Sequence, residues 1–295
     1  MRPYRITHLT HYRYAAPVAL GRHRLMLRPR DSHAMRLRET ALLIHPQPAE
    51  LRWLFDVYGN SVAIASFAGT TTECRIESRV ELEHYGLEDF SLVTEPFARR
   101  WPFNYQPEEA PDLAPYLARH WADPAGELDR WALRFVRGTD DIDTEALLVS
   151  MARTIKETLP YRARYAEGTQ SPLVTLAHGG TCRDFAALMM EALRALGIAA
   201  RFVSGYLYSP ALDPAHDGRG GGTVGAGATH AWVDIYLPGA GWVEFDPTNV
   251  LFGGRDLIRV CVARAPEQAV PISGSFTGPP DAALPLEVSV VVDWL

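Results

Sequence analysis

The first 95 residues alternate between apolar and polar positions, which is the pattern of β-strands that bury one face. The clearest alternation covers residues 72–85, where glutamates and arginines occupy every second position and mostly apolar residues, including Cys74, lie between them. Cys74 is therefore expected to point into a core. Further strands are predicted at 24–28, 38–45, 52–56 and 61–67. We predict a β-rich N-terminal domain over residues 1–95, with the architecture of a small β-sandwich.

Residues 96–125 are rich in proline and tryptophan, and they are interpreted as a linker with a short helix at 113–120. Beyond this linker, apolar residues recur every three or four positions, which is helical spacing. The spacing predicts helices over 126–137 and 144–159. We predict that residues 126–295 form a second domain.

The most informative stretch of the chain runs from residue 179 to residue 197. Two glycines precede Thr181, a suitable helix N-cap with Asp184 three positions later, and apolar side chains then recur at helical spacing up to Gly197. Cys182 falls in the first turn, where backbone N–H groups and the helix dipole favour an anion and lower the pKa of a thiol. Cys182 is therefore a candidate nucleophile. A small buried apolar side chain is an equally good interpretation of this segment alone.

A glycine-rich loop and a hairpin follow a predicted strand at 200–208. The loop, residues 209–228, does not open a helix and has no Gly-Lys-Ser/Thr ending, so we expect a mobile flap beside a site rather than a phosphate-binding loop. The hairpin pairs residues 229–237 with 241–247. If it is centred near Pro238, His230 lies opposite Asp246, close enough for a hydrogen bond. A surface His–Asp pair is the alternative interpretation.

Composition excludes several classes of function. The chain has 295 residues and a net charge of −6, so no global basic field favours nucleic acid. No apolar run approaches the ~20 residues that span a membrane, and the N-terminus lacks the apolar core of a signal peptide. The three cysteines are far apart, which disfavours a disulfide framework and a Cys-x-x-Cys metal site. Cys261 lies in a predicted strand at 257–263 and is expected to be buried. A last strand is predicted at 286–292. Because no disulfide framework is indicated, a cytoplasmic location is predicted.

Three motifs in order suggest acyl transfer by a Cys-His-Asp arrangement: a thiol nucleophile, an imidazole base and a carboxylate that orients the imidazole. The first motif is Gly180-Thr181-Cys182-Arg183-Asp184-Phe185-Ala186, and it resembles the nucleophile segment of microbial transglutaminase-like proteins. The other two resemble the family's His and Asp strands: Thr229-His230-Ala231-Trp232-Val233 and Gly241-Trp242-Val243-Glu244-Phe245-Asp246-Pro247-Thr248-Asn249. The β-rich start of the chain is similar to the region that precedes this domain in bacterial members.

The resemblance implies an α+β fold in which a papain-like core, residues 126–295, packs its Cys-bearing helix on an antiparallel sheet. It implies Cys182 as nucleophile, His230 as base and Asp246 as the orienting acid. The backbone N–H of Cys182 is one expected oxyanion donor. Candidates for the second donor and for substrate binding are Tyr165 and Gln170 in the loop before the helix. Further candidate substrate-binding residues are Trp232, Asp234 and Glu244, although a wall role for Trp232 and a solvated rim for the two acids are the alternatives.

We predict an enzyme that acts on amide bonds of a peptide or protein substrate through a thioester on Cys182. Whether water or an amine resolves the thioester is left open, as is the oligomeric state. No Asp-x-Asp-x-Asp-Gly loop is present, so neither a metal nor another cofactor is expected. The alternatives are a transglutaminase-like scaffold that binds peptides without turnover, and a zinc site on Cys182 and His230, which lacks enough soft ligands.

Overall fold

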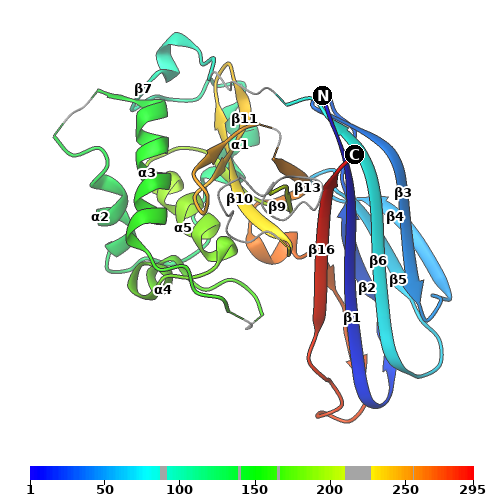
Figure 1. Cartoon of the computed structure of the whole chain (residues 1–295). Helices are drawn as coiled ribbons and strands as arrows, with labels where there is room; N and C mark the ends of the chain where they lie inside the picture. Colours follow the sequence, from blue (N-terminus) through cyan, green and yellow to red (C-terminus); the bar gives the residue numbers. More distant parts are fainter. Residues whose placement is uncertain (87–91, 139–140, 165–166, 210–226, 255) are drawn as a thin grey trace.

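The structure, a computed structural model, describes residues 1–86, 92–138, 141–164, 167–209, 227–254 and 256–295 (Figure 1). Long strands lie on the right of Figure 1, most helices lie on the left, and a further sheet lies between them. All pairings between the named strands are antiparallel. The predicted combination of helices with antiparallel sheets is therefore confirmed.

Two sheets built mainly from the N-terminal residues enclose an apolar core. The first sheet contains β1 (Arg2–Leu20), β6 (Thr71–His84), β3 (Met35–His45), β15 (Phe276–Thr277) and β16 (Glu287–Trp294). The second contains β14 (Ile272–Ser273), β2 (His23–Arg28), β5 (Ser61–Ser66) and β4 (Glu50–Phe55). Leu25, Leu27, Cys74 and Ile76 are buried together between them. The alternation over 72–85 thus places Cys74 in the core, as its pattern predicted.

The C-terminal tail pairs with the N-terminal strands rather than with the second half of the chain. β16 runs antiparallel to β1 from Tyr4 opposite Trp294 to His11 opposite Glu287. β14 and β15 likewise pair with β2 and β1. This differs from the predicted grouping of residues 126–295 in one domain. The physical reason is that β1 offers a second edge beside β6, and β16 satisfies its backbone hydrogen bonds.

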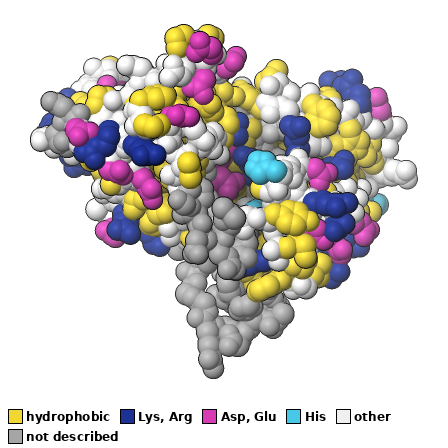
Figure 2. All heavy atoms as spheres, turned by 90° about the horizontal axis from the view of Figure 1, so that it is seen from above, with side chains coloured by type: hydrophobic (Ala, Val, Ile, Leu, Met, Phe, Trp, Pro, Cys, Tyr) yellow, Lys and Arg dark blue, Asp and Glu magenta, His cyan; other side chains and the backbone are white. Residues whose placement is uncertain are grey.

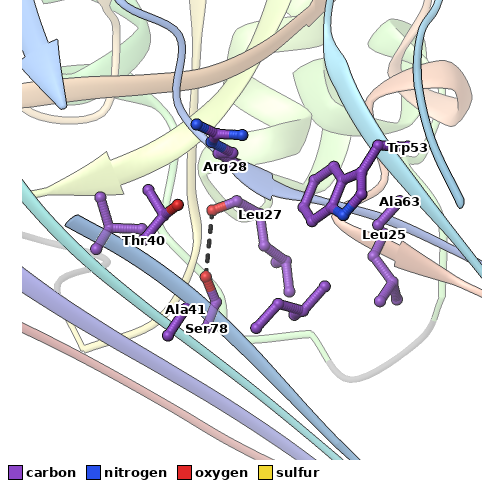
Figure 3. Close-up of a pocket in the computed structure, with 10 residues that line it drawn as sticks. Leu25, Leu27, Arg28, Thr40, Ala41, Trp53, Ala63 and Ser78 are labelled. Atoms are coloured by element: carbon purple, nitrogen blue, oxygen red, sulfur yellow. Dashed lines mark hydrogen bonds between the residues drawn. The ribbon is translucent and has the colours of Figure 1, made fainter. Parts of the chain in front are cut away.

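A small cavity lies between the two N-terminal sheets (Figure 3). Leu25, Leu27, Ala63 and Trp53 line it, and Ser78 donates a hydrogen bond of 3.5 Å to the carbonyl of Leu27 beside it. Its volume is about 50 Å³, which leaves room for a few water molecules and none for a peptide. The cavity is therefore too small to be the site of a peptide substrate.

The second half of the chain forms a five-stranded sheet with helices packed against it. The sheet order is β12 (Leu251–Phe252), β11 (Gly241–Asp246), β10 (His230–Leu237), β9 (Ala200–Leu207) and β13 (Leu257–Ala263). The helices are α1 (Ala110–Leu117), α2 (Glu127–Leu133), α3 (Thr144–Thr158), α4 (Pro172–His178) and α5 (Cys182–Ala195). Short elements complete the chain: η1 (Pro96–Ala98), β7 (Arg100–Trp101), β8 (Ile142–Asp143) and η3 (Pro266–Ala269).

Helix α5 is the centre of this half. Its apolar residues, among them Phe185, Leu188 and Met189, share one core with Val233 and Ile235 of β10. Val233 and Ile235 thus face α5, and the neighbouring Trp232 packs in another cluster, because side chains alternate along a strand. None of the described helices is long and apolar enough to cross a bilayer. On the face that Figure 2 shows, acidic and basic side chains are interspersed among apolar ones.

Buried contacts join the two halves. Tyr4 and Ile6 of β1 pack against Tyr206 and Ile258 of the five-stranded sheet. The side chain of Asn60, in the turn between β4 and β5, pairs with the backbone of Val262 in β13: its amide donates to the carbonyl at 2.7 Å, and its carbonyl accepts from the N–H at 2.9 Å. The side-chain amide of Asn60 thus pairs with the backbone of β13 in the way that a neighbouring strand would.

Replacing Asn60 by alanine is expected to lower the free energy of unfolding by ~2–4 kcal/mol, because the buried N–H and carbonyl of Val262 lose their partners. Chemical denaturation followed by tryptophan fluorescence measures this change. Asn104 is exposed, so Asn104→Ala is the matched control, with an expected effect within ~0.5 kcal/mol. Equal effects of the two substitutions would show that the Asn60 contact contributes nothing.

Candidate active site

Cys182 is the first residue of α5, and the chain before it is fixed by a buried carboxylate. Asp184 accepts hydrogen bonds from the backbone N–H and the hydroxyl of Thr181, both at 2.9 Å. This carboxylate–N-cap contact fixes the direction in which the chain enters the helix. Cys182 itself is 9% exposed. The buried thiol thus lies at the positive end of the helix dipole.

Asp184 also holds the loop that precedes the helix. It pairs with Arg164 at 2.9 Å and accepts the backbone N–H of Gln170 at 3.0 Å. Burial opposes ionisation of Asp184, but Arg164 and these hydrogen bonds hold its pKa below the ordinary value. The side-chain amide of Gln170 donates to the hydroxyl of Thr175 at 3.1 Å and to the carbonyl of Gly179 at 2.6 Å. Both hydrogens of the side-chain amide of Gln170 are therefore used, one by α4 and one by the residue that follows it.

Replacing Asp184 by alanine is expected to lower the free energy of unfolding at pH 7 by ~3–5 kcal/mol, because it leaves the guanidinium of Arg164 and the N-cap without their acceptor. Since the pKa of Asp184 is lowered on folding, this contribution is present above the unfolded pKa and is lost as the pH falls through the folded one. Urea denaturation at pH 7 and pH 3 measures both effects.

The matched control for Asp184 is Asp143, the exposed N-cap of α3, whose carboxylate accepts the N–H of Ala146 at 2.9 Å. Asp143→Ala should cost ~1 kcal/mol. If Asp184→Ala costs no more than this, the buried carboxylate does not anchor the loop.

His230 and Asp246 meet across the hairpin of β10 and β11. The Nε2 atom of His230 lies 2.8 Å from the Oδ2 atom of Asp246, and both side chains are fully buried. The ladder pairs Asp234 with Glu244, so His230 and Asp246 are diagonal neighbours on one face. The predicted register, with His230 directly opposite Asp246, is therefore displaced, although the predicted contact is present. The turn is centred on Gly239, with the positive φ of 89° that glycine adopts, instead of on Pro238.

Asp246 is held in an orientation that favours its charged form. It accepts the backbone N–H of Thr248 at 2.8 Å and the side-chain amide of Asn249 at 2.9 Å. Burial opposes ionisation, but the charge of His230 and these hydrogen bonds lower the pKa of Asp246. A carboxylate in this position fixes the ring of His230 and stabilises its protonated form.

The thiol of Cys182 and the imidazole of His230 form an interacting pair. The Nε2 atom of His230 is used by Asp246, and its buried Nδ1 atom has no hydrogen-bond partner within the described part of the chain. Nδ1 is thus the atom that can exchange a proton with the thiol. Burial raises the pKa of Cys182, but interaction with His230 and the backbone N–H of Ala231 outweighs burial and lowers it. Burial lowers the pKa of His230, but Asp246 and Cys182 together raise it to about 10. Both directions favour the charged forms, a thiolate on Cys182 and an imidazolium on His230.

The other predicted residues of the sheet face have different surroundings. The ring of Trp232 is fully buried and stacks beside that of His230, with centroids 6.1 Å apart and an interplanar angle of 30°. Asp234 is buried and pairs with Arg201 at 2.9 Å and Arg259 at 3.2 Å. Glu244 is partly exposed, and burial and the neighbouring Asp234 raise its pKa to about 8. Asp234 is therefore held in two ion pairs, and Glu244 is less deeply buried than Asp234.

One residue near the thiol was not predicted as part of the site. Tyr161 interacts through its hydroxyl with the backbone N–H and the thiol of Cys182. The signal in the sequence was weak, because Tyr161 stands in a polar loop that contains another tyrosine. The second tyrosine of this loop, Tyr165, was the predicted candidate, and it lies outside the described residues. No group of three or more His, Cys, Asp or Glu side chains that could hold a metal occurs among the residues that the structure describes.

Family models match both halves of the chain. Residues 4–83 match the model described as bacterial transglutaminase-like N-terminal region. Residues 129–247 match the model described as transglutaminase-like superfamily, and this match contains Cys182, His230 and Asp246. The two matches thus cover the N-terminal sheets and the part of the chain that carries the candidate site.

Similar proteins extend the match over nearly the whole chain. An uncharacterized protein of Mycobacterium bovis is 31% identical over 98% of this chain and 92% of its own length. A solved structure from Cytophaga hutchinsonii, described as a candidate cysteine protease, superposes with a TM-score of 0.69 over 99% of this chain and 90% of that one, at 18% identity, and so shares the fold. A protein-glutamine gamma-glutamyltransferase of Pseudomonas aeruginosa is 37% identical over 31% of this chain and 13% of its own length.

Proposed function

Because the chain belongs to the transglutaminase-like superfamily, we propose that it is a cysteine-nucleophile enzyme acting on amide bonds of peptide-like substrates through a thioester on Cys182. One observation carries the proposal: His230 is held by the carboxylate of Asp246 at 2.8 Å through one nitrogen and interacts with the thiol of Cys182. A binding scaffold does not need a buried base between a thiol and a carboxylate. The proposal includes a papain-like arrangement, in which α5 lies against β9 and β10.

The proposed reaction begins with attack of the Cys182 thiolate on an amide carbonyl carbon. The Sγ–C bond forms while the carbonyl electron pair moves to oxygen, which gives a tetrahedral oxyanion beside the backbone N–H of Cys182. The pair then returns, the C–N bond breaks, and the imidazolium of His230 gives its proton to the leaving amine. The thioester remains on Cys182, and Asp246 keeps the ring of His230 in place throughout.

Water or a primary amine then resolves the thioester. His230, now neutral, takes a proton from the attacking molecule, the new C–O or C–N bond forms, and the C–Sγ bond breaks to regenerate the thiolate. Water gives hydrolysis of the amide, and an amine gives transfer of the acyl group. The substrate of the proposal is an exposed side-chain or main-chain amide of a peptide or protein, and no metal or other cofactor enters the reaction.

Mass spectrometry with a library of glutamine-containing peptides tests the proposal. The purified chain is incubated with the library, with and without a primary amine, beside the Cys182→Ala variant. Deamidation, peptide cleavage or amine incorporation, each absent with the variant, supports the enzyme and names the reaction. An acyl adduct on Cys182 that disappears after hydroxylamine treatment supports the thioester. Peptides that bind equally to both proteins and stay unchanged would support the scaffold instead.

A further inference from the structure

The proposed reaction needs a second hydrogen-bond donor for the oxyanion, and the loop before α5 offers one. A single backbone N–H, that of Cys182, leaves half of the usual pair of donors unassigned. The side-chain amide of Gln170 already donates to Thr175 of α4 and to Gly179. A donor has to come from a group that lies beside both the backbone and the sulfur of Cys182.

The backbone carries Tyr161 to this position. Residues 160–162 run parallel to Gly180, with the N–H of Arg162 donating to the Gly180 carbonyl at 2.9 Å and the N–H of Gly180 donating to the Pro160 carbonyl at 3.2 Å. Gly179 permits the approach: a Cβ atom there would lie 2.0 Å from the carbonyl oxygen of Pro160, and its φ is +74°. The backbone of Tyr161 is therefore paired with that of Gly180, two residues before Cys182.

The ring and hydroxyl of Tyr161 are oriented toward the start of α5. The ring meets Phe185 edge to face, with centroids 6.0 Å apart. The hydroxyl interacts with the backbone N–H of Cys182 as acceptor and with the Cys182 thiol. Tyr161 is also 39% exposed, whereas Cys182 is 9% exposed, so solvent reaches the tyrosine beside the buried thiol.

We propose that the hydroxyl of Tyr161 is the second oxyanion donor of this site, a conclusion that rests on the proposed function. In the empty site the hydroxyl oxygen occupies the place beside the Cys182 N–H that the substrate oxygen takes in the tetrahedral intermediate. When the carbonyl enters, its oxygen accepts from that N–H, and the phenol turns its O–H toward the same oxygen. The O–H donates throughout and transfers no proton, so Tyr161 stabilises charge without taking part in bond making.

The hydroxyl keeps its proton under working conditions. Burial and the neighbouring thiol of Cys182 raise the pKa of Tyr161 to about 12. The group is therefore a neutral donor at pH 7, and the alternative role of a phenolate base is excluded at that pH. Because its hydroxyl also interacts with the thiol, Tyr161 is expected to stabilise the thiolate of Cys182 modestly. A test therefore has to separate oxyanion stabilisation from activation of the thiol.

Two reagents make this separation on the intact chain. p-Nitrophenyl acetate acylates Cys182 through a tetrahedral oxyanion: the Sγ–C bond forms, the ester C–O bond breaks and p-nitrophenolate leaves. Iodoacetamide alkylates the same thiolate by direct displacement of iodide, without an oxyanion. Tyr161→Phe keeps the ring beside Phe185 and removes only the hydroxyl. We expect the burst of p-nitrophenolate to slow by about 10²-fold, while alkylation changes by less than about fivefold.

Controls and contrary outcomes are distinct. Tyr236→Phe removes a hydroxyl that bonds to Glu109 in the same half of the chain, and it should change neither rate. Cys182→Ala gives the background of both reactions. Equal slowing of acylation and alkylation by Tyr161→Phe would make Tyr161 a residue that only tunes the thiol, and faster acylation would make it a plug; either overturns the inference. Failure of the wild-type chain to be acylated at Cys182 would overturn the proposed function itself.

Discussion

Alanine in place of His230 is expected to slow alkylation of Cys182 by iodoacetamide at pH 7 by about 10²-fold and acyl transfer by up to about 10⁴-fold. The thiol is buried, and burial alone raises its pKa; interaction with His230 reverses the direction. Without the imidazole, the thiol is protonated at neutral pH and loses its reactivity. Acyl transfer suffers more than alkylation because it also loses the group that protonates the leaving amine.

The pH dependence gives the sign of the interaction. In the wild-type chain the pKa of the thiol is lowered and that of His230 is raised to about 10, so the ion pair exists between these values. Alkylation should therefore stay fast at neutral pH and fall only as the pH drops through the lowered value. Turnover should fall again near pH 10, where His230 loses its proton. Because Tyr161, Asp246 and His230 all interact with the thiol, the two limbs of the profile report apparent pKa values of the interacting groups together, and not of Cys182 or His230 alone.

The other two cysteines leave this measurement undisturbed. Both are buried, and burial raises the pKa of Cys74 to about 11 and that of Cys261 to about 12. They remain protonated at pH 7, so alkylation counts Cys182 alone, and Cys182→Ala supplies the baseline. An alkylation profile for His230→Ala that matches the wild-type profile would show that His230 does not activate the thiol.

The helix with Cys182 could be predicted from sequence because its signals are local. Thr181, Asp184 and the apolar spacing act within a few residues of one another, and α5 indeed begins at Cys182 and ends at Ala195. The contact of His230 with Asp246 could be predicted only approximately. Its register depends on backbone angles at the turn, where Gly239 and not Pro238 is the centre, and the residue types alone do not fix those angles.

The role of the tail and of Tyr161 depends on contacts between segments far apart in the sequence. β16 has the same alternation as any strand, and nothing in it names β1 as its partner. Tyr161 reaches Cys182 through a backbone pairing that Gly179 permits by its lack of a side chain. In both cases the structure depends on packing between segments that are far apart in the sequence, and local propensity and residue spacing do not report that packing.

Replacement of Asp246 by asparagine is expected to reduce kcat by about 10³–10⁴-fold with a small change in KM, because the substitution keeps the shape of the side chain and removes the charge that orients His230. An amide N–H in this position would oppose the Nε2–H of His230 and favour the wrong tautomer. The carboxylate also raises the pKa of His230, so the alkaline limb of the turnover profile should move to lower pH in the variant. Steady-state kinetics from pH 6 to pH 11 with the substrate identified by mass spectrometry measures both changes.

The matched control for Asp246 is Glu191, another fully buried carboxylate, which pairs with Arg194 at 3.0 Å on α5. Glu191→Gln removes a buried charge far along the helix from the thiol, so it should lower the free energy of unfolding and leave kcat and the alkaline limb in place. If Asp246→Asn affects stability alone, as Glu191→Gln is expected to, the carboxylate is structural. If the alkaline limb shifts with Asp246→Asn and not with Glu191→Gln, the charge of Asp246 takes part in the reaction. Loss of folded protein changes the amount of active enzyme and not the pH at which His230 titrates.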